Sequence, residues 1–468
     1  MSSSLPFSVV VIGAGPGGYV AAIKAAQEGH SVALIESDHV GGTCLNVGCI
    51  PSKTLLSHAE TLRTVRNAEK QGIYIKEISF DYQKMWQNKE GVVKSIRESL
   101  KGLIASNQIT LFEGKGSFVS PKTIKVSGEN NHLLKADHVI IATGSEAADI
   151  AAFPCDHERI LNSTSILNLQ KLPDSITIIG GGYIGCEFAS LFVTLGVKVT
   201  IVEALGGAIA TQGKMLSDAL TEALRAQGIH ILTHQRVQSI EHHGEGVQVI
   251  LEGGESLSSD LAMVAIGRKY HSEGLNLSAA GISLTSQGSI PVNASMQTEV
   301  PGIYAIGDIT GQGMLAHVAS HHGLVAAADI TNKSLHLNPD AIPAVIFTHP
   351  EIAYVGFTAE EAKKRGREIQ VGRFPFQALG KAVATMKTQG FVEIVADKIT
   401  GAIIGAQIIG EGASVMISEM AVAITNELTL ECLHDTVHPH PTLSEAWLEA
   451  ALIASGKPLH FPPSPRKG

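Results

Sequence analysis

The chain has 468 residues, which at about 150 residues per domain predicts about three domains. Thirty-five Lys and Arg residues stand against 44 Asp and Glu residues, and the net charge of −9 argues against a large, sequence-independent nucleic-acid surface. Hydrophobic residues make up 44% of the chain and charged residues 17%, so the chain can bury large cores and is not a disordered protein.

Neither a membrane span nor a signal peptide is predicted. The longest apolar stretches fall well below the roughly 20 residues that a span needs. The apolar run after Phe7 leads into a glycine motif and lacks the basic start of a signal peptide. Five Cys residues are too few for a disulfide scaffold, so we expect a cytoplasmic protein in which a Cys pair is catalytic or metal-binding.

The first predicted unit runs from Val9 to Glu36 and reads as strand, tight turn, helix and second strand. Its turn contains Gly13, Gly15 and Gly18. In such a unit the first glycine permits the turn, the second lets a pyrophosphate approach the backbone, and the third lets helix pack on strand. The helix N-terminus favours phosphate, and the acid that ends the second strand binds ribose hydroxyls. The pattern predicts a dinucleotide site.

A Cys pair follows directly, with Cys44 and Cys49 five residues apart. A helix predicted to begin at Pro51 would place the pair at its N-terminus, where the helix dipole and Lys53 lower a thiol pKa. A zinc site would need four ligands, and the sequence holds no second Cys pair. A purely structural disulfide would add little in a reducing compartment. We therefore favour a redox-active pair over both alternatives.

Apolar residues recurring every three and four positions predict a helix from Phe80 to Gln108, and residues 109–141 read as short strands. A second unit, residues 176–203, then repeats the first. Gly13 to Glu36 and Gly180 to Glu203 both span 23 residues, and the second turn contains Gly180, Gly182 and Gly185. The charge of Glu203 would repel a 2′-phosphate, so the second site is expected to take NAD and not NADP.

Two later apolar strands, at 261–268 and 302–308, end in glycine plus a polar residue. Ligands bind at the carboxyl ends of parallel strands, so Asp308 is a candidate ligand contact, with an ordinary strand-end turn as the alternative. Beyond residue 340, alternating strands precede helices at Ala413–Asn426 and Leu443–Ser455. The group His317, His321 and His322 has helical spacing and is interpreted as a solvated or packed helix face, so no metal site is predicted.

A possible base lies near the C-terminus, where His440 stands five residues before Glu445. A catalytic thiol needs a base, and a carboxylate bonded to the imidazole ring would set its tautomer and raise its basicity. From spacing alone, an ordinary histidine in a Pro-rich turn is the competing interpretation.

Taken together, these motifs resemble the pyridine nucleotide–disulfide oxidoreductases over about residues 7–456. The segments that carry the resemblance are GGTCLNVGCIPSK at 41–53, ATGS at 142–145, GGGYIGCEFA at 180–189, TEVPGIYAIGD at 298–308, MLAH at 314–317 and HPHPTLSE at 438–445. The resemblance implies an α/β fold with two Rossmann-like dinucleotide-binding domains, for FAD and NAD, plus a C-terminal α+β dimerisation domain. The implied divisions are 1–147 (FAD-binding), 148–269 (NAD-binding), 270–339 (central, completing the FAD site), 340–456 (interface) and 457–468 (flexible tail).

The family roles fall on matching residues of this chain. Cys44 would be the interchange thiol and Cys49 the flavin-proximal thiol. Lys53 would lie beside the flavin and pair with Glu187, and His440 with Glu445 would be the base. The implied FAD contacts are Gly13, Gly15, Gly18, Glu36, Thr43, Lys53, Gly116, Thr143, Gly144, Asp308 and Ala316. The implied NAD contacts are Gly180, Gly182, Gly185, Glu203, Val237, Gly267 and Arg268.

The resemblance is greatest to members that oxidise protein-bound dihydrolipoamide and reduce NAD. It implies a homodimer whose active site is completed by His440 of the partner subunit. Implied partners are the lipoyl and E3-binding domains of a 2-oxo-acid dehydrogenase acyltransferase and the glycine cleavage carrier protein, with no nucleic acid and no membrane. Alternatives are a glutathione- or mercuric-reductase-like enzyme or a mainly complex-binding structural subunit. Residues Leu205–Lys214 depart from the family pattern, which has Pro and Asp there.

Overall fold

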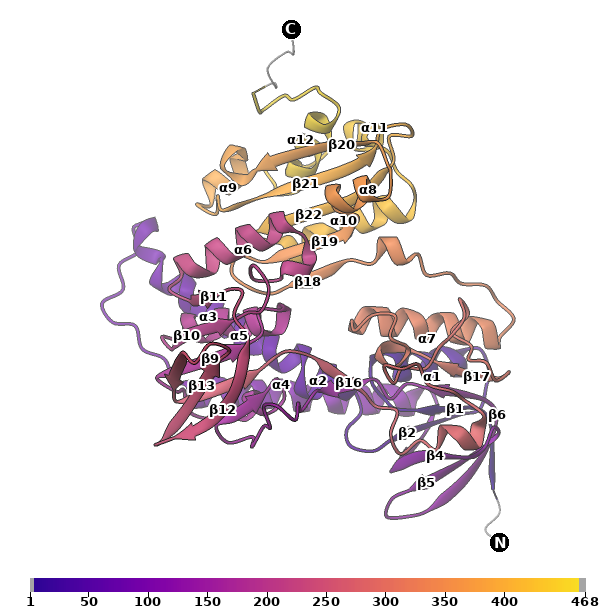
Figure 1. Cartoon of the computed structure of the whole chain (residues 1–468). Helices are drawn as coiled ribbons and strands as arrows, with labels where there is room; N and C mark the ends of the chain where they lie inside the picture. The colour runs from indigo at the N-terminus through magenta and orange to yellow at the C-terminus, as the bar shows by residue number, and fades with distance from the viewer. Residues whose placement is uncertain (1–3, 463–468) are drawn as a thin grey trace. The chain divides into compact units, whose positions relative to one another are not determined.

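The computed structural model describes residues 4–462 (Figure 1). These residues form two compact units. Of the described residues, the first unit contains 4–150, 161–172 and 266–337. The second unit contains 151–160, 173–265 and 338–462. Each unit therefore joins segments that are distant in the sequence.

The first unit is built on a largely parallel sheet whose central strands are buried toward their carboxyl ends. Its central strand β1 (Leu5–Ile12) lies between β2 (Val32–Glu36) and β6 (His132–Ile141), both parallel to it. The outer strands are β3 (Thr110–Glu113) beside β2, β17 (Ile303–Ala305) beside β6, and the antiparallel β4 (Lys115–Ser120) and β5 (Thr123–Ser127). Continuous runs of Val and Ile suit strands buried on both faces. The short strands predicted over 109–141 are confirmed.

Two helices of the first unit pack side by side through glycines. They are α1 (Pro16–Gln27) and α7 (Ala316–Ile330), which run close together in Figure 1. A Cβ on Gly17 would lie 2.8 Å from the Ala319 carbonyl oxygen, and one on Gly323 would lie 2.6 Å from the Gly17 oxygen. Only glycine permits this approach, which brings the start of α1 against α7.

The Cys segment forms two helices, which corrects one expectation. The chain turns through α2 (Gly42–Val47) into α3 (Cys49–Arg66), so the long helix begins at Cys49 and not at Pro51. Gly48 separates the helices with φ −143° and ψ −109°, and a Cβ there would lie 2.9 Å from the Thr43 carbonyl oxygen. The predicted helix over 80–108 is confirmed as α4 (Tyr82–Ser106), which Asp81 caps by accepting a hydrogen bond from the Lys84 N–H.

The second unit repeats the strand–helix–strand arrangement of the first. Its parallel strands lie in the order β11 (His230–Leu232), β10 (Lys198–Val202), β9 (Ser175–Ile179), β15 (Leu261–Val264). Helix α5 (Tyr183–Thr194) connects β9 to β10 as α1 connects β1 to β2. Helix α6 (Lys214–Ala226) follows, and β12 (Val237–His243), β13 (Gly246–Leu251) and β14 (Ser256–Ser259) form a separate antiparallel sheet.

The C-terminal part of the second unit is an antiparallel sheet covered by helices. Its strands lie in the order β18 (Ala344–Ile346), β19 (Ile352–Gly356), β22 (Ile403–Gly410), β21 (Gly390–Asp397), β20 (Ile369–Pro375). The helices are α10 (Ala413–Thr425), α11 (Leu430–Asp435) and α12 (Glu445–Ala454). Trp447 of α12 is fully buried in their common core, and a Cβ on Gly372 of β20 would lie 1.9 Å from the Ala450 carbonyl oxygen. The predicted α/β class with a C-terminal α+β part is confirmed.

The predicted tail falls partly on residues 463–468, which lie outside the described residues. Its described beginning is held by α12, because His460 bonds the Glu449 carboxylate through Nδ1 at 2.7 Å. Phe461 packs edge-on against Phe374 of β20. Over residues 4–462, no helix combines the length and apolarity that crossing a membrane requires.

Candidate active site

The two glycine turns have the same geometry. Gly13 and Gly180 have φ of +102° and +106°, a region that favours glycine. A Cβ on Gly18 would lie 1.9 Å from the Gly13 carbonyl oxygen, and one on Gly185 would lie 2.1 Å from the Gly180 oxygen. Helices α1 and α5 therefore pack on their strands at a distance that no side chain permits.

The acid at the end of each second strand is fixed against its turn. The Glu36 carboxylate accepts hydrogen bonds from the Ala14 N–H at 2.8 Å and the Asp38 N–H at 2.9 Å. In the same way, the Glu203 carboxylate accepts hydrogen bonds from the Gly181 and Leu205 N–H groups, both at 2.6 Å. Both carboxylates are held where a ribose diol bound at the turn would reach them.

Both turns fit a dinucleotide. Within the described residues, no side chain caps α1 or α5, so their first N–H groups remain available to a phosphate. The space beside the middle glycines is open: a Cβ on Gly182 would meet nothing within 4 Å, and one on Gly15 only the Gly42 Cα at 3.9 Å.

Gly18→Ala is expected to destabilise the first unit by about 1–3 kcal/mol or more, because the added Cβ collides with backbone and not with a flexible side chain. Thermal unfolding measures the loss as a lower melting temperature. Gly91→Ala in α4 is the matched control, since its Cβ meets nothing within 4 Å; it should stabilise by about 0.5–1 kcal/mol. A Gly18→Ala protein as stable as the wild type would contradict this packing.

The predicted FAD contacts gather at the carboxyl edge of the first sheet. Strands β1, β6 and β17 end in register, with Ile12 opposite Ile141 and Ile141 opposite Ala305. The residues that follow these ends include Gly13, Thr143, Gly144 and Asp308. Gly116 of β4 lies beside them, because a Cβ there would lie 3.0 Å from Ile12 Cγ2. Ala316 begins α7.

Ser145 organises this edge, although the sequence reasoning did not select it. Its hydroxyl donates to the Asp308 carboxylate at 2.5 Å and accepts from Arg268 Nε at 2.8 Å. Its carbonyl oxygen accepts from Arg268 Nη2 at 2.7 Å and from the Thr43 hydroxyl at 3.2 Å. The resemblance implies that Arg268 contacts NAD. In the structure the Arg268 side chain lies in the first unit, where it fixes Ser145 and Asp308. The sequence signal that could have identified Ser145 is its position as the polar residue directly after Gly144.

The Cys pair is assembled as two reduced thiols in hydrogen-bonding contact. The hydrogen bond with Cys49 raises the pKa of Cys44, burial raises it further, and the positive charge of Lys53 opposes both. For Cys44 the direction of the pKa shift is opposite to the expected lowering, because the hydrogen bond with Cys49 and burial outweigh the charge of Lys53. Cys49 is the first residue of α3, where the helix dipole favours a thiolate.

His440 and Glu445 form the predicted pair. Nδ1 of His440 lies 2.8 Å from the Glu445 Oε1, and Glu445 Oε2 accepts from the Thr442 N–H at 2.8 Å. Burial alone would raise the pKa of Glu445, but these hydrogen bonds lower it. An ionised Glu445 requires hydrogen on Nδ1, which leaves Nε2 of neutral His440 able to accept a proton. The His440 side chain is 76% exposed in the chain.

The remaining predicted residues come from both units. Glu187 is buried in α5, and its carboxylate accepts from the Phe347 N–H at 2.9 Å. Its pairing with Lys53 stays a prediction. Val237 begins β12 in the second unit, whereas Gly267 belongs to the first.

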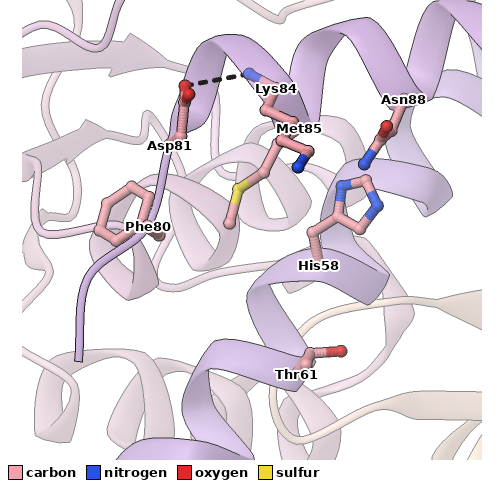
Figure 2. A pocket seen from close by; sticks show the side chains of 7 residues that line it. All are labelled: His58, Thr61, Phe80, Asp81, Lys84, Met85 and Asn88. Atoms are coloured by element: carbon pink, nitrogen blue, oxygen red, sulfur yellow. Dashed lines mark hydrogen bonds between the residues drawn. The ribbon is translucent and has the colours of Figure 1, made fainter. Parts of the chain in front are cut away.

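A cavity of about 270 Å³ in the first unit lies outside every predicted site (Figure 2). It is lined by His58, Thr61, Phe80, Asp81, Lys84, Met85 and Asn88. His58 Nδ1 is buried without a hydrogen-bond partner among the described residues, and burial lowers the pKa of this histidine.

Known proteins match this chain along nearly its whole length. Residues 7–323 match the family described as pyridine nucleotide-disulphide oxidoreductase, and residues 342–451 match its dimerisation domain. The chain belongs to this family. It is 49% identical to the dihydrolipoyl dehydrogenase of Chlamydia pneumoniae (98% of this chain, 99% of that protein) and 40% identical to that of Geobacillus stearothermophilus (97% of each).

Two solved structures have the same fold as this chain. The crystal structure of LpdA from Mycobacterium tuberculosis superposes with a TM-score of 0.91 at 27% identity, covering 96% of this chain and 99% of that one. The HOCl-induced flavoprotein disulfide reductase RclA from Escherichia coli gives a TM-score of 0.85 at 29% identity, covering 95% and 99%.

Proposed function

We propose that this chain oxidises dihydrolipoamide to lipoamide through the Cys44–Cys49 pair and reduces NAD. The observation that carries the proposal is the contact between the Cys44 thiol of α2 and the Cys49 thiol at the start of α3. The match to proteins named dihydrolipoyl dehydrogenase over nearly their full length supports the substrate.

The thiol chemistry follows from the residues present. In the oxidised enzyme, one substrate thiol gives its proton to Nε2 of His440 and attacks Sγ of Cys44. The Cys44–Cys49 bond breaks, a mixed disulfide forms, and Cys49 leaves as a thiolate favoured by the start of α3. The second substrate thiol, on losing its proton, attacks the substrate sulfur of the mixed disulfide. Lipoamide is released and Cys44 takes up a proton, so two electrons have entered the Cys pair.

FAD fits the first glycine turn and NAD the second. When bound, they supply the route that takes these two electrons away as a hydride on NAD. Gly13, Gly18 and Glu36 would hold FAD at the turn, and Asp308, fixed by Ser145, would hold it at the sheet edge. Gly180, Gly185 and Glu203 would hold NAD.

The same proposal includes the assembly. The dimerisation domain at 342–451 supports a homodimer, in which His440 of the partner subunit would complete each site. The divisions at 147, 269, 339 and 456, the lipoyl-domain and acyltransferase partners, the glycine cleavage carrier protein and a cytoplasmic location belong to this proposal. Size-exclusion chromatography with light scattering tests the dimer, and cell fractionation tests the location.

Glu203→Gln is expected to reduce the preference for NAD over NADP at least about fivefold, since two unit charges 4 Å apart repel by about 1 kcal/mol even in water. The comparison is kcat/KM with each coenzyme. Glu222→Gln, an exposed acid on α6, is the matched control and should change neither value. An unchanged preference in Glu203→Gln would remove Glu203 from coenzyme selection.

The function itself is tested by turnover with a panel of substrates. Purified holoprotein should form NADH from dihydrolipoamide and NAD, and should not consume NADPH with glutathione disulfide or Hg²⁺. Activity in only one of the NADPH reactions would instead assign a glutathione- or mercuric-reductase-like enzyme. Bound FAD without turnover in any of the assays would favour the complex-binding subunit.

A further inference from the structure

The segment that carries His440 is held by side chains. It connects α11 to α12, and within the described residues the stretch Val437–Pro441 makes no backbone–backbone hydrogen bond. A segment without such bonds keeps one shape only if side chains fix it. Because His440 lies in this stretch, the position of its ring depends on those side chains.

On its C-terminal side the segment is fixed close to His440 itself. The Thr442 hydroxyl donates to the Pro439 carbonyl oxygen at 2.8 Å, and Glu445 holds both the Thr442 N–H and the His440 ring. These contacts orient the ring toward α12.

On its N-terminal side a single side chain turns inward. The neighbouring Val437 is 92% exposed, whereas the His438 side chain is 4% exposed. Nε2 of His438 lies 3.0 Å from the Glu419 carboxylate of α10, and Nδ1 lies 3.1 Å from the Thr436 carbonyl oxygen. Both ring nitrogens therefore face acceptors, an arrangement fully satisfied only when both carry hydrogen.

The electrostatics agree with this geometry. The hydrogen bond with Glu419 raises the pKa of His438, and the charge of Glu445 adds to it. A ring that donates from both nitrogens has no lone pair left to take a proton from a substrate. His438 therefore differs from His440, whose Nε2 has no hydrogen-bond partner in the described part of the chain.

We propose that His438 is a positioning residue for the catalytic base: bonded to Glu419 of α10, it anchors the segment that presents His440. This inference rests on the proposed function, because positioning affects turnover only if His440 takes the substrate proton. Through His438, Glu419 of α10 fixes the part of the segment that precedes His440. Glu445 of α12 fixes the His440 ring itself.

The test uses the full-length holoprotein and two reactions. Oxidation of dihydrolipoamide by NAD needs the base, whereas reduction of ferricyanide by NADH needs only the cofactors. His438→Ala should lower kcat with dihydrolipoamide about 10- to 100-fold, the loss expected from an ångström-scale misplacement of a reacting group. It should leave the ferricyanide rate, the FAD content and the midpoint of the acid limb of the pH profile unchanged.

Two further variants distinguish a loss of positioning from a loss of folding. His438→Gln retains a donor that can reach Glu419 and should recover most of the loss, and Glu419→Ala should reproduce the loss. Val437→Ala is the matched control, because its exposed side chain is the neighbour of His438 in the same segment. It should behave as the wild type.

Three outcomes overturn the proposal. The first is full dihydrolipoamide turnover in His438→Ala. The second is that His438→Ala, His438→Gln and Glu419→Ala all lose FAD, or all lose the dihydrolipoamide and ferricyanide reactions to the same extent. The third is a shifted acid limb that His438→Gln does not restore, which would make His438 itself the base. His440→Gln, measured in the same assays, distinguishes failure of the proposed function from failure of the positioning role. Full turnover in His440→Gln would contradict the proposed function. An inactive His440→Gln together with a fully active His438→Ala would contradict only the positioning role of His438.

Discussion

Replacing Cys44 by Ser is expected to lower dihydrolipoamide oxidation at least about 10⁴-fold, as the loss of a covalent nucleophile does in enzymes whose groups act as a unit. A serine hydroxyl cannot form the disulfide with Cys49 through which the electrons enter. Cys49→Ser should be as inactive, because it removes the other sulfur of the same bond. The rate of NADH formation is the measurement.

The chain offers a matched control for the Cys variants. Cys432 lies in the short helix α11, where it contacts the Thr429 hydroxyl, and has no part in the proposed chemistry. Cys432→Ser should therefore turn over at the wild-type rate. Residual activity above about 1% in Cys44→Ser, with Cys432→Ser normal, would show that the electrons do not pass through the pair.

His440→Gln should lower kcat with dihydrolipoamide by about 10²- to 10⁴-fold, the range that positioned general bases contribute. Glutamine fills a similar volume and can still donate to Glu445, but it cannot accept the substrate proton. Glu445→Gln should cost less, because the ring remains and loses only its fixed tautomer and the charge that stabilises its protonated form. Steady-state kinetics over pH 5–9 would separate the two effects.

An exposed His–carboxylate pair elsewhere serves as the control for His440. His242 lies 3.0 Å from Asp156 and is 56% exposed, in a part of the second unit unconnected with thiol chemistry. His242→Gln should leave the rate unchanged. If His440→Gln retained more than about a tenth of the rate, a different residue would have to take the proton.

The fold was predictable where the sequence carries regular spacing. The repeat at Gly13–Glu36 and Gly180–Glu203 predicted β1–α1–β2 and β9–α5–β10, because turn sterics and strand burial depend on neighbouring residues. The helix boundary at Cys49 was missed because Gly48 ends α2 by a local backbone turn that apolar periodicity does not record.

The site was predictable in part, for a related reason. The Cys pair and the His440–Glu445 pair are close in sequence, so spacing made both candidates, although the role of His440 as the base also depended on the family resemblance. Ser145 and His438 were missed because their partners, Asp308 and Glu419, are 163 and 19 residues away. Contacts of this kind depend on how strands and helices assemble, and a single sequence does not record them.

Differential alkylation tests most directly that the Cys pair carries the electrons. The holoprotein is treated anaerobically with dihydrolipoamide or with excess NAD, alkylated, and analysed by peptide mass spectrometry. Cys44 and Cys49 should be alkylated after dihydrolipoamide and protected together after NAD, with Cys155, Cys186 and Cys432 unchanged between the two states. Equal labelling of Cys44 and Cys49 in both states would contradict the assignment of this pair as the redox centre.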